Sequence, residues 1–303
     1  MKRVLVCGSN GLLGQKLAWM LQCENAFEVL HTSHHRYFHL GNFPFDYTQL
    51  DISVRSDVKS LVSSFRPDVI LNAAAMANVD LCEKEKEQAW KANVVGVENL
   101  VEISRRIGAK FVHVSTDYVF DGRMPPYSEE SRVNPVNYYG KTKLAGENVI
   151  RKGGIDHAIL RTVLVYGNGI HIRENFALWV INSLKQGKTI RCVDDQISNP
   201  THVTDLARAM INIIQHERSG IYHISGPEAV SRFDFASRIA GHFGLDKNLI
   251  ERVKTPVLSL PAARPLNTTF SIDKARRDVS YHPMTIDQGL AALKEEIQNI
   301  HLN

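Results

Sequence analysis

The stretch Arg3–Gly14, R-V-L-V-C-G-S-N-G-L-L-G, predicts how the chain begins to fold. Arg3–Cys7 is a short run of β-branched and apolar residues, which is typical of a buried strand. Leu12–Gln22, which follows it, is typical of a helix. Three glycines separate the two segments with the spacing G-x-x-G-x-x-G. A glycine-rich turn between a strand and a helix is typical of a site that binds the phosphates of a dinucleotide.

Each glycine of this turn has a distinct physical use. Gly8 permits the tight turn, Gly11 lets the backbone approach a pyrophosphate, and Gly14 lets the helix pack closely on the strand. The first turn of the helix adds free N–H groups and the positive end of the helix dipole. A plain turn without a ligand is the alternative, since many dehydrogenases have G-x-G-x-x-G instead. The residues that we expect to contact a dinucleotide are Gly8, Asn10, Gly11, Leu12, Leu13 and Gly14.

The rest of the first half alternates between strands and helices. Strands are predicted at Phe27–His31, within Phe45–Asp51, at Asp68–Asn72 and at Lys110–Ser115; helices are predicted at Val54–Phe65, Glu85–Ile107 and Tyr138–Ile150. Such alternation predicts βαβ units and a parallel sheet with helices on both faces. Strands that are apolar throughout suit burial on both faces. The sequence therefore predicts an α/β protein with a Rossmann-type, doubly wound parallel sheet.

The alternation loosens after Arg161. The elements predicted there are strands at Ala158–Leu160, Thr189–Cys192 and Gly220–Ile224, and helices at Asn175–Gln186, Val203–His216, Phe233–Phe243 and Ile286–Ile297. We interpret residues 1–163 as a dinucleotide-binding domain and residues 164–303 as a smaller α/β substrate-binding lobe. The lobe can lend elements back to the main sheet.

Composition narrows the class of protein. The 303 residues carry a net charge of only +4, with basic and acidic residues mixed, so no nucleic-acid partner is expected. No stretch approaches 18 consecutive apolar residues, so no membrane span is expected. The four cysteines lie far apart and form no C-x-x-C, which favours a reducing, cytoplasmic location.

The residues after the second strand indicate which dinucleotide is bound. A carboxylate there would bind the adenosine 2′-hydroxyl of NAD, whereas an arginine accommodates the 2′-phosphate of NADP. The sequence after Leu30 is H-T-S-H-H-R, without a carboxylate. NADP(H) is therefore favoured over NAD(H), with Ser33 and Arg36 as phosphate partners; a solvated loop is the alternative. We expect no metal here, since neither cysteine nor carboxylate accompanies His34 and His35.

Tyr139 and Lys143 are the strongest candidates for chemistry. They stand four residues apart in a segment without proline, so a helix would stack them on one face. A phenol has an ordinary pKa of about 10, and a neighbouring ammonium is expected to lower it. Such a phenol can exchange a proton with a carbonyl oxygen. A surface tyrosine and lysine on an amphipathic helix is the alternative for this spacing alone.

Four blocks together extend this interpretation to a family: the glycine turn, N-A-A-A at 72–75, S-T-D-Y-V-F-D-G at 115–122 and Y-G-K-T-K-L-A-G-E at 139–147. With them the sequence resembles the extended short-chain dehydrogenases/reductases and, more narrowly, the dTDP-4-dehydrorhamnose reductase family. D-D-Q at 194–196, N-P-T at 199–201 and R-P-L-N at 264–267 extend the resemblance nearly end to end.

The resemblance implies roles for individual residues. Thr116, Tyr139 and Lys143 would be the catalytic group, with Ser115 as a less favoured substitute for Thr116. Further cofactor contacts would be Asp51, Ile52, Ala73, Ala74, Ala75, Tyr139 and Lys143. Asn93 would support the lysine through a water molecule. Substrate contacts would be Thr116, Asp117, Asn175, Thr201 and Arg264, the last as a fork for a diphosphate.

Two positions depart from the family pattern. The chain has Met76 where the reductases usually have histidine, and Val163-Leu164 where they often have serine and tryptophan. Because that tryptophan belongs to the sugar pocket, the identity of the deoxysugar stays open.

The function expected from the resemblance is NADPH-dependent reduction of the 4-keto group of a nucleotide-activated deoxysugar. A homodimer is compatible with it, because relatives are often dimers. A nucleotide-sugar epimerase or dehydratase is a second interpretation, although Thr116 is followed by Asp117-Tyr118 rather than the Asp-Glu pair frequent in dehydratases. A third is a non-catalytic, NADP-binding regulatory subunit, since the sequence is also similar to the regulatory β subunit of methionine adenosyltransferase.

Overall fold

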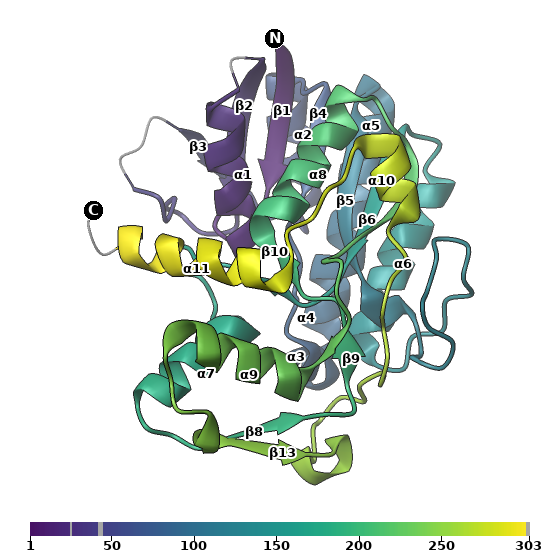
Figure 1. The fold of residues 1–303 in the computed structure, drawn as a ribbon. Helices are drawn as coiled ribbons and strands as arrows, with labels where there is room; N and C mark the ends of the chain where they lie inside the picture. The colour runs from purple at the N-terminus through teal and green to yellow at the C-terminus, as the bar shows by residue number, and fades with distance from the viewer. Residues whose placement is uncertain (25, 42–44, 301–303) are drawn as a thin grey trace.

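The computed structural model describes residues 1–24, 26–41 and 45–300 (Figure 1). Seven parallel strands form its main sheet in the order β11-β6-β5-β4-β1-β2-β3. Their bounds are β1 Lys2–Cys7, β2 Phe27–Ser33, β3 Asp46–Gln49, β4 Val69–Asn72, β5 Lys110–Thr116, β6 His157–Thr162 and β11 Gly220–Ile224. The strand order reverses between β1 and β4, which creates a crevice at the carboxyl ends of these strands. The predicted doubly wound α/β fold is confirmed.

Helices cover both faces of the sheet. The helices on one face are α1 (Leu12–Gln22), α8 (Val203–Gln215) and α10 (Asp273–Val279). Those on the other face are α2 (Arg55–Phe65), α5 (Gly96–Ile107) and α6 (Tyr138–Lys152). Strand β1 shows why its sequence is apolar throughout: Val4 and Val6 join the first core, whereas Leu5 and Cys7 join the second.

The long helix predicted at Glu85–Ile107 is interrupted by an irregular turn. It consists of α4 (Lys86–Trp90), the π-helical segment η1 (Lys91–Val95) and α5. Asn93 of η1 is buried, and its amide bonds both backbone groups of Met76 and the hydroxyl of Thr142. Single π-helical turns are frequent at functional sites, and this one ties the segment after β4 to α6.

The second half of the chain contributes to both parts of the molecule. Strand β11 and helix α8 complete the main sheet and its cover, although both come after residue 163. A smaller lobe lies at one end of the sheet in Figure 1 and has its own apolar core. Its helices are α7 (Phe176–Lys185), α9 (Arg232–Phe243) and α11 (Ile286–Ile300), and its longest strand pair is β8 (Ile190–Val193) with β13 (Ile250–Val253).

Several short elements were not predicted. These are the helices α3 (Val79–Lys84) and α10, the strands β7 (Val165–Tyr166), β9 (Ile197–Ser198), β10 (Thr201–His202), β12 (Val230–Ser231) and β13, and the 3₁₀ turns η2 (Asp117–Val119), η3 (Lys247–Leu249) and η4 (Thr255–Leu258). Strands of two residues have no period that a sequence could display.

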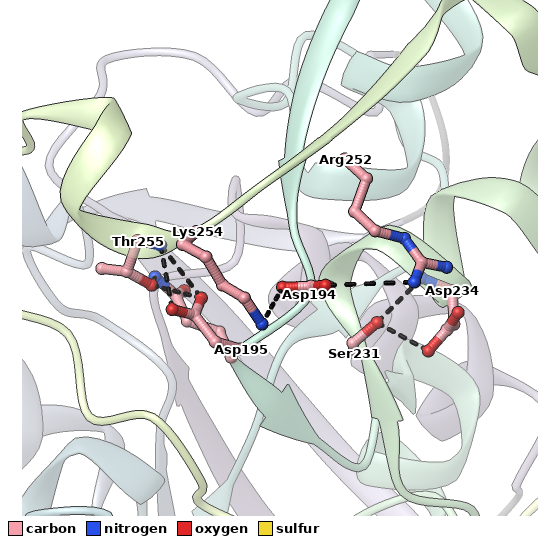
Figure 2. Close-up of polar contacts among 8 residues, drawn as sticks. Asp194, Asp195, Ser231, Asp234, Arg252, Lys254 and Thr255 are labelled. Carbon is pink, nitrogen blue, oxygen red and sulfur yellow. Dashed lines mark hydrogen bonds and ion pairs between the residues drawn. The ribbon is translucent and has the colours of Figure 1, made fainter.

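Polar contacts join the residues that follow β8 to those that follow β13 (Figure 2). The carboxylate of Asp195 accepts hydrogen bonds from the backbone N–H and the hydroxyl of Thr255 at 2.7–3.0 Å. The neighbouring Asp194 pairs with Lys254 at 2.8 Å. These bonds fix the start of the proline-containing segment that leads back toward the main sheet.

Within the described residues, no helix combines the length and the apolar character that crossing a membrane would require.

Candidate active site

A cavity of about 550 Å³ lies at the carboxyl ends of the central strands. Its walls include residues of the glycine turn, of the segments after β4 and β5, of α6 and of the small lobe. A larger hollow of about 780 Å³ lies near the amino ends of the strands, where charged residues such as Lys2, Arg66 and Asp68 line it. Ligands of doubly wound sheets bind at the carboxyl ends, at the point where strand order reverses. We therefore take the first cavity as the candidate site.

The glycine turn is shaped by two close approaches of the backbone. Gly8 has φ +86°, and a Cβ there would lie 2.6 Å from the backbone nitrogen of Ala74. A Cβ on Gly14 would lie 2.2 Å from the Gly8 carbonyl oxygen. Side chains at either position would therefore separate the strand, the turn and α1.

Gly11, by contrast, lines the cavity at the start of α1. It is the N-cap residue of α1 and provides no side-chain cap, and the first turn of α1 carries no acidic residue. The N–H groups of Leu12, Leu13 and Gly14 precede the first helical hydrogen bond, from Gln15 N–H to Gly11, and these residues line the cavity. Uncapped N–H groups on a helix end without negative charge fit a pyrophosphate.

Asn10 connects the turn to the end of β2. Its amide nitrogen donates to the Ser33 hydroxyl and to the Tyr37 carbonyl, both at 2.9 Å, and its oxygen accepts from His39 N–H. Ser33 also bonds Tyr47 at 2.8 Å, so its hydroxyl is held beside the turn. Arg36 is exposed in the same loop, with its guanidinium 5.4 Å from the centre of the Tyr37 ring. The predicted phosphate partners thus lie next to the turn but outside the cavity wall.

The cofactor contacts implied by the resemblance flank the same crevice. Ala73 and Ala75 line the cavity, whereas Ala74 packs under Gly8. Asp51 is exposed and accepts hydrogen bonds from Ser53, and these lower its pKa against the effect of burial. Ile52 is buried against Gly96 of α5, so it lies behind the crevice rather than in the wall.

The predicted catalytic residues come together in the cavity wall. Thr116 ends β5, and Tyr139 and Lys143 lie one turn apart on α6, as the spacing predicted. Helix α6 is held at this place by its N-cap Asn137, whose side chain accepts from Gly140 N–H at 2.8 Å. A Cβ on Gly140 would lie 2.1 Å from the Tyr118 carbonyl oxygen, so glycine permits the close approach of α6 to the segment after β5.

The pKa of Tyr139 moves opposite to our expectation. Burial raises the pKa of this phenol well above its usual value, the Thr116 side chain lowers it, and Asp117 raises it further. The expected lowering by Lys143 was wrong for this arrangement. Burial is the largest cause of the raised pKa, and Lys143 Nζ contacts the Val114 carbonyl at 2.7 Å and His113 Nε2 at 3.1 Å.

Asp117 and Tyr118 add polar groups to the wall after β5. Asp117 is buried and accepts hydrogen bonds from Thr268 at 2.6 Å and from Thr116 at 3.1 Å, and burial raises its pKa to about 6. The Tyr118 ring meets the Tyr139 ring edge-on at 6.0 Å. Asp117 therefore connects Thr116 to Thr268.

Of the three candidate substrate contacts in the second half of the chain, one lines the cavity and two do not. Asn175 caps α7, donates to the Gly167 carbonyl at 2.8 Å and lines the cavity. Thr201 is buried and donates to the Val163 carbonyl at 2.7 Å, outside the cavity wall. Arg264 also lies outside the wall, where it pairs with Asp80 at 2.9 Å and donates to the Ala262 carbonyl.

Two arginines that were not predicted do line the cavity. Arg173 is exposed in the loop before α7, and Arg232 begins α9 with its guanidinium 5.5 Å from the centre of the Phe176 ring. One terminal nitrogen of Arg232 is buried without a hydrogen-bond partner among the described residues. The sequence signal for Arg232 was the Ser231–Asp234 capping pair, which places it in the first turn of a helix.

The departures from the family pattern bear on the same wall. Leu164, at the tryptophan position, lines the cavity with φ +42°, whereas Val163 is buried in the core. Met76 lies near the Asn93 amide, to which both of its backbone groups are bonded. Leu164 is apolar like a tryptophan, but its side chain is smaller and is not aromatic.

The histidines that follow β2 lie close to one another. His34 and His35 have ring centres 4.0 Å apart, and His35 and His39 have centres 5.1 Å apart. Among the residues that the structure describes, no group of three or more His, Cys, Asp or Glu side chains is arranged to hold a metal ion.

Three comparisons place the chain among known proteins. The family model described as RmlD substrate binding domain matches residues 1–299. The spore coat polysaccharide biosynthesis protein SpsK of Bacillus subtilis is 34% identical and covers 89% of each chain. A dTDP-4-dehydrorhamnose reductase of Aggregatibacter actinomycetemcomitans is 32% identical over 97% of this chain and 99% of its own. The methionine adenosyltransferase 2 subunit beta of Xenopus laevis is 32% identical over 91% and 82%.

Solved structures agree with the sequence relatives. A dTDP-4-dehydrorhamnose reductase of Clostridium acetobutylicum superposes with a TM-score of 0.86 at 31% identity, over 99% of both chains. A dTDP-4-dehydrorhamnose reductase of Bacillus anthracis in complex with NADP superposes with a TM-score of 0.83 at 32% identity, over 98% and 100%. The chain therefore belongs to the family of the RmlD substrate binding domain, the dTDP-4-dehydrorhamnose reductase family.

Proposed function

We propose that the protein reduces the 4-keto group of a nucleotide-activated deoxysugar with NADPH, and that dTDP-4-dehydrorhamnose or a close relative is the substrate. The observation that carries the proposal is the cavity in which the uncapped end of α1 lies close to Thr116, Tyr139 and Lys143. Relatives that match nearly end to end are dTDP-4-dehydrorhamnose reductases, and one of their structures contains NADP.

The glycine turn fits the dinucleotide. The N–H groups of Leu12, Leu13 and Gly14 would hold the pyrophosphate, and Ser33 and Arg36 would hold the 2′-phosphate beyond the turn. When bound, NADPH supplies the hydride that the carbonyl carbon accepts. Ala73 and Ala75, which carry small side chains, leave room in the wall between the two ends of the site.

Tyr139 is the proposed proton donor to the carbonyl oxygen. The phenol carries its proton near neutral pH and can give it away, although burial holds the pKa of Tyr139 above the range near the working pH that is most favourable for a general acid. Thr116 donates its hydroxyl proton to Asp117 in this structure and would turn that proton to the same substrate oxygen to hold it in place. Lys143 completes the group from the next turn of α6.

The small lobe would bind the nucleotide-sugar. Arg173 and Arg232 line the cavity, and one terminal nitrogen of Arg232 is buried without a hydrogen-bond partner among the described residues, which suits charge-assisted contacts to a diphosphate. Asn175 adds an amide to the same wall. We further propose the division into residues 1–163 for the cofactor and 164–303 for the substrate, with β11 and α8 returning to the main sheet.

The decisive experiment is a turnover assay. Purified protein is mixed with dTDP-4-dehydrorhamnose and either NADPH or NADH, and cofactor absorbance is followed. We expect oxidation of NADPH that depends on the sugar, and a slower reaction with NADH. Tight NADPH binding with no turnover on this or related 4-keto nucleotide-sugars would overturn the reductase proposal.

A regulatory subunit is the second candidate. Its support is the similarity to methionine adenosyltransferase 2 subunit beta, which reaches 32% identity over 91% of this chain. In that case the protein would bind NADP(H) and a methionine adenosyltransferase without turnover. Co-purification with that enzyme, together with a silent turnover assay, would favour this candidate.

Location and assembly complete the proposal. The four cysteines are free thiols, three of them buried, which supports a reducing cytoplasmic compartment. A homodimer stays a proposal that light scattering of the purified protein would test.

A further inference from the structure

The loop between β7 and α7 contacts the helix of the glycine turn. It comprises residues 167–175, and Arg173 near its end lines the cavity. The middle of the loop is hydrogen-bonded to Gln15, the residue of α1 directly after the glycine turn. Gln15 is only 3% exposed. One buried side chain thus connects the helix at the cofactor end of the site with the loop that carries an arginine to the substrate end.

The Gln15 side chain uses its amide in three hydrogen bonds. Its Nε2 donates to the Ile170 carbonyl at 2.7 Å and to the Asn10 carbonyl at 3.0 Å. Its Oε1 accepts from the Ile170 N–H at 2.9 Å. The two bonds with Ile170 match those that a pair of residues exchanges in an antiparallel sheet. Both N–H donors of the amide are therefore in use, and its orientation is fixed.

The partners of Gln15 require an amide. The two carbonyl oxygens need donors, and the Ile170 N–H needs an acceptor. A carboxylate of the same length would set oxygen against both carbonyls, whereas a lysine or an arginine would leave the N–H without an acceptor. A backbone group that is removed from water without a partner costs free energy. Gln15 therefore suits this loop by its chemistry as well as by its size.

The loop has a conformation that depends on its neighbours. His171, directly after Ile170, has φ +50°, which is disfavoured for a residue with a side chain. Such conformations persist where the surrounding contacts hold them. A Cβ on Gly169 would lie 2.8 Å from Gln15 Oε1, so glycine lets the loop pass directly over the amide. The contacts with Gln15 thus hold this turn of the loop in place.

A second contact ties the same loop to α1. The Asn168 N–H donates to one carboxylate oxygen of Glu296, on α11, at 3.0 Å. The other oxygen of Glu296 pairs with Lys16 Nζ at 2.6 Å. Consecutive residues of α1 therefore hold Ile170 directly and Asn168 through α11. The loop belongs to the second half of the chain by sequence, but α1 determines where it lies.

We propose that Gln15 is a positioning residue that couples the two ends of the candidate site. Its amide ties the loop of Arg173 to the Asn10 carbonyl, in the turn that would hold the pyrophosphate. A dinucleotide bound there fixes the turn, so less conformational freedom is lost when a second diphosphate orders Arg173. Each ligand then strengthens the binding of the other by the same factor. The identity of the two ligands rests on the proposed function.

Hydrogen exchange of the full chain tests the contact without any turnover. The Ile170 N–H should exchange more slowly when NADP⁺ is bound. In Gln15→Met, which keeps the length of the side chain without its polar groups, this N–H should exchange about tenfold faster, and NADP⁺ should no longer slow it. Gln22→Met is the matched control, because Gln22 is exposed at the other end of α1. Binding of NADP⁺ that leaves the exchange of Ile170 unchanged in the wild type would overturn the proposal.

Calorimetric titration with dTDP, a nucleoside diphosphate, measures the coupling itself. Saturating NADP⁺ should lower the Kd of dTDP by about fivefold or more in the wild type and in Gln22→Met. The factor should fall below about twofold in Gln15→Met and in Gly169→Ala, which disturbs the same contact from the side of the loop. A general loss of stability would weaken dTDP equally with and without NADP⁺. An unchanged factor in both variants would overturn the proposal. Failure of dTDP to bind any of these proteins would instead contradict the proposed substrate, and the exchange of Ile170 would still decide the role of Gln15.

Discussion

The two ends of the candidate site are built in different ways. The cofactor end consists of one continuous turn, Gly8–Gly14, and uses backbone N–H groups at the start of α1. The substrate end gathers side chains from segments far apart in the sequence, among them Thr116, Tyr139 and Arg232. A backbone site depends on residues that lack a side chain, whereas a side-chain site depends on single functional groups. The two ends should therefore respond differently to mutation.

Removing the proposed proton donor should have the largest effect. Tyr139→Phe deletes one oxygen from the cavity wall, and loss of a general acid lowers kcat by roughly 10²- to 10⁴-fold. NADPH binding should stay within about twofold, because the α1 end is unchanged. Steady-state kinetics and a binding titration measure the two quantities. Tyr138→Phe is the matched control, since Tyr138 precedes it on α6 but does not line the cavity. A Tyr139→Phe rate near that of the control would move the donor elsewhere.

Substitutions in the glycine turn should act through steric clashes with the backbone. In Gly14→Ala the new Cβ would lie 2.2 Å from the Gly8 oxygen and 2.5 Å from Ser9 Cα, which should cost about 3 kcal/mol of unfolding free energy. Gly11→Ala meets only the Gly8 oxygen, at 3.3 Å, and should cost less than about 1 kcal/mol while weakening NADPH. Urea unfolding and NADPH titration separate the two effects. Equal stability of the two variants would contradict the packing role of Gly14.

Two arginine variants test which arginine contacts the diphosphate at the substrate end. Arg232→Ala should raise KM for the nucleotide-sugar about tenfold, the effect of losing about 1.4 kcal/mol of charge-assisted bonding. Arg264→Ala should leave KM within about threefold, because Arg264 is paired with Asp80 outside the cavity wall. Its effect should appear in thermal unfolding instead. The reverse pattern would return the diphosphate contact to Arg264.

The smallest effect is expected at the rim of the cofactor end. Arg36 is exposed, so its contact with a 2′-phosphate is worth about 1 kcal/mol, or about fivefold in Kd. Arg36→Ala should weaken NADPH by that factor and leave NADH unchanged. The difference should shrink at high salt because exposed charges are screened. Equal weakening of both cofactors would remove the phosphate contact.

Local patterns predicted the frame of the site. The helix bounds of α1 agree with the prediction at both ends, and the four-residue spacing of Tyr139 and Lys143 does place both in the wall. Helical periodicity and glycine geometry depend on neighbours within a few residues, which a sequence displays directly. The same holds for the parallel sheet, which follows from alternating strands and helices.

Partners distant in sequence could not be predicted in this way. Arg264 is a plausible phosphate ligand by residue type, yet the fold gives it Asp80, 184 residues away. Arg232 was not predicted, yet the first turn of α9 places it in the cavity wall. The pKa of Tyr139 is raised rather than lowered because the tertiary structure buries the phenol, and the Lys143 amine contacts His113 and the Val114 carbonyl of β5.

The sequence by itself determined the glycine turn, the fold class and the family. Each of these depends on the spacing of residues within short segments and on the order of short sequence motifs along the chain. Only the tertiary structure decided which charged groups meet. Two side chains on one helix are neighbours by helical geometry, but the other groups that they contact depend on which strand packs against that helix. For Lys143 that strand is β5, which supplies His113 and the Val114 carbonyl as its contacts.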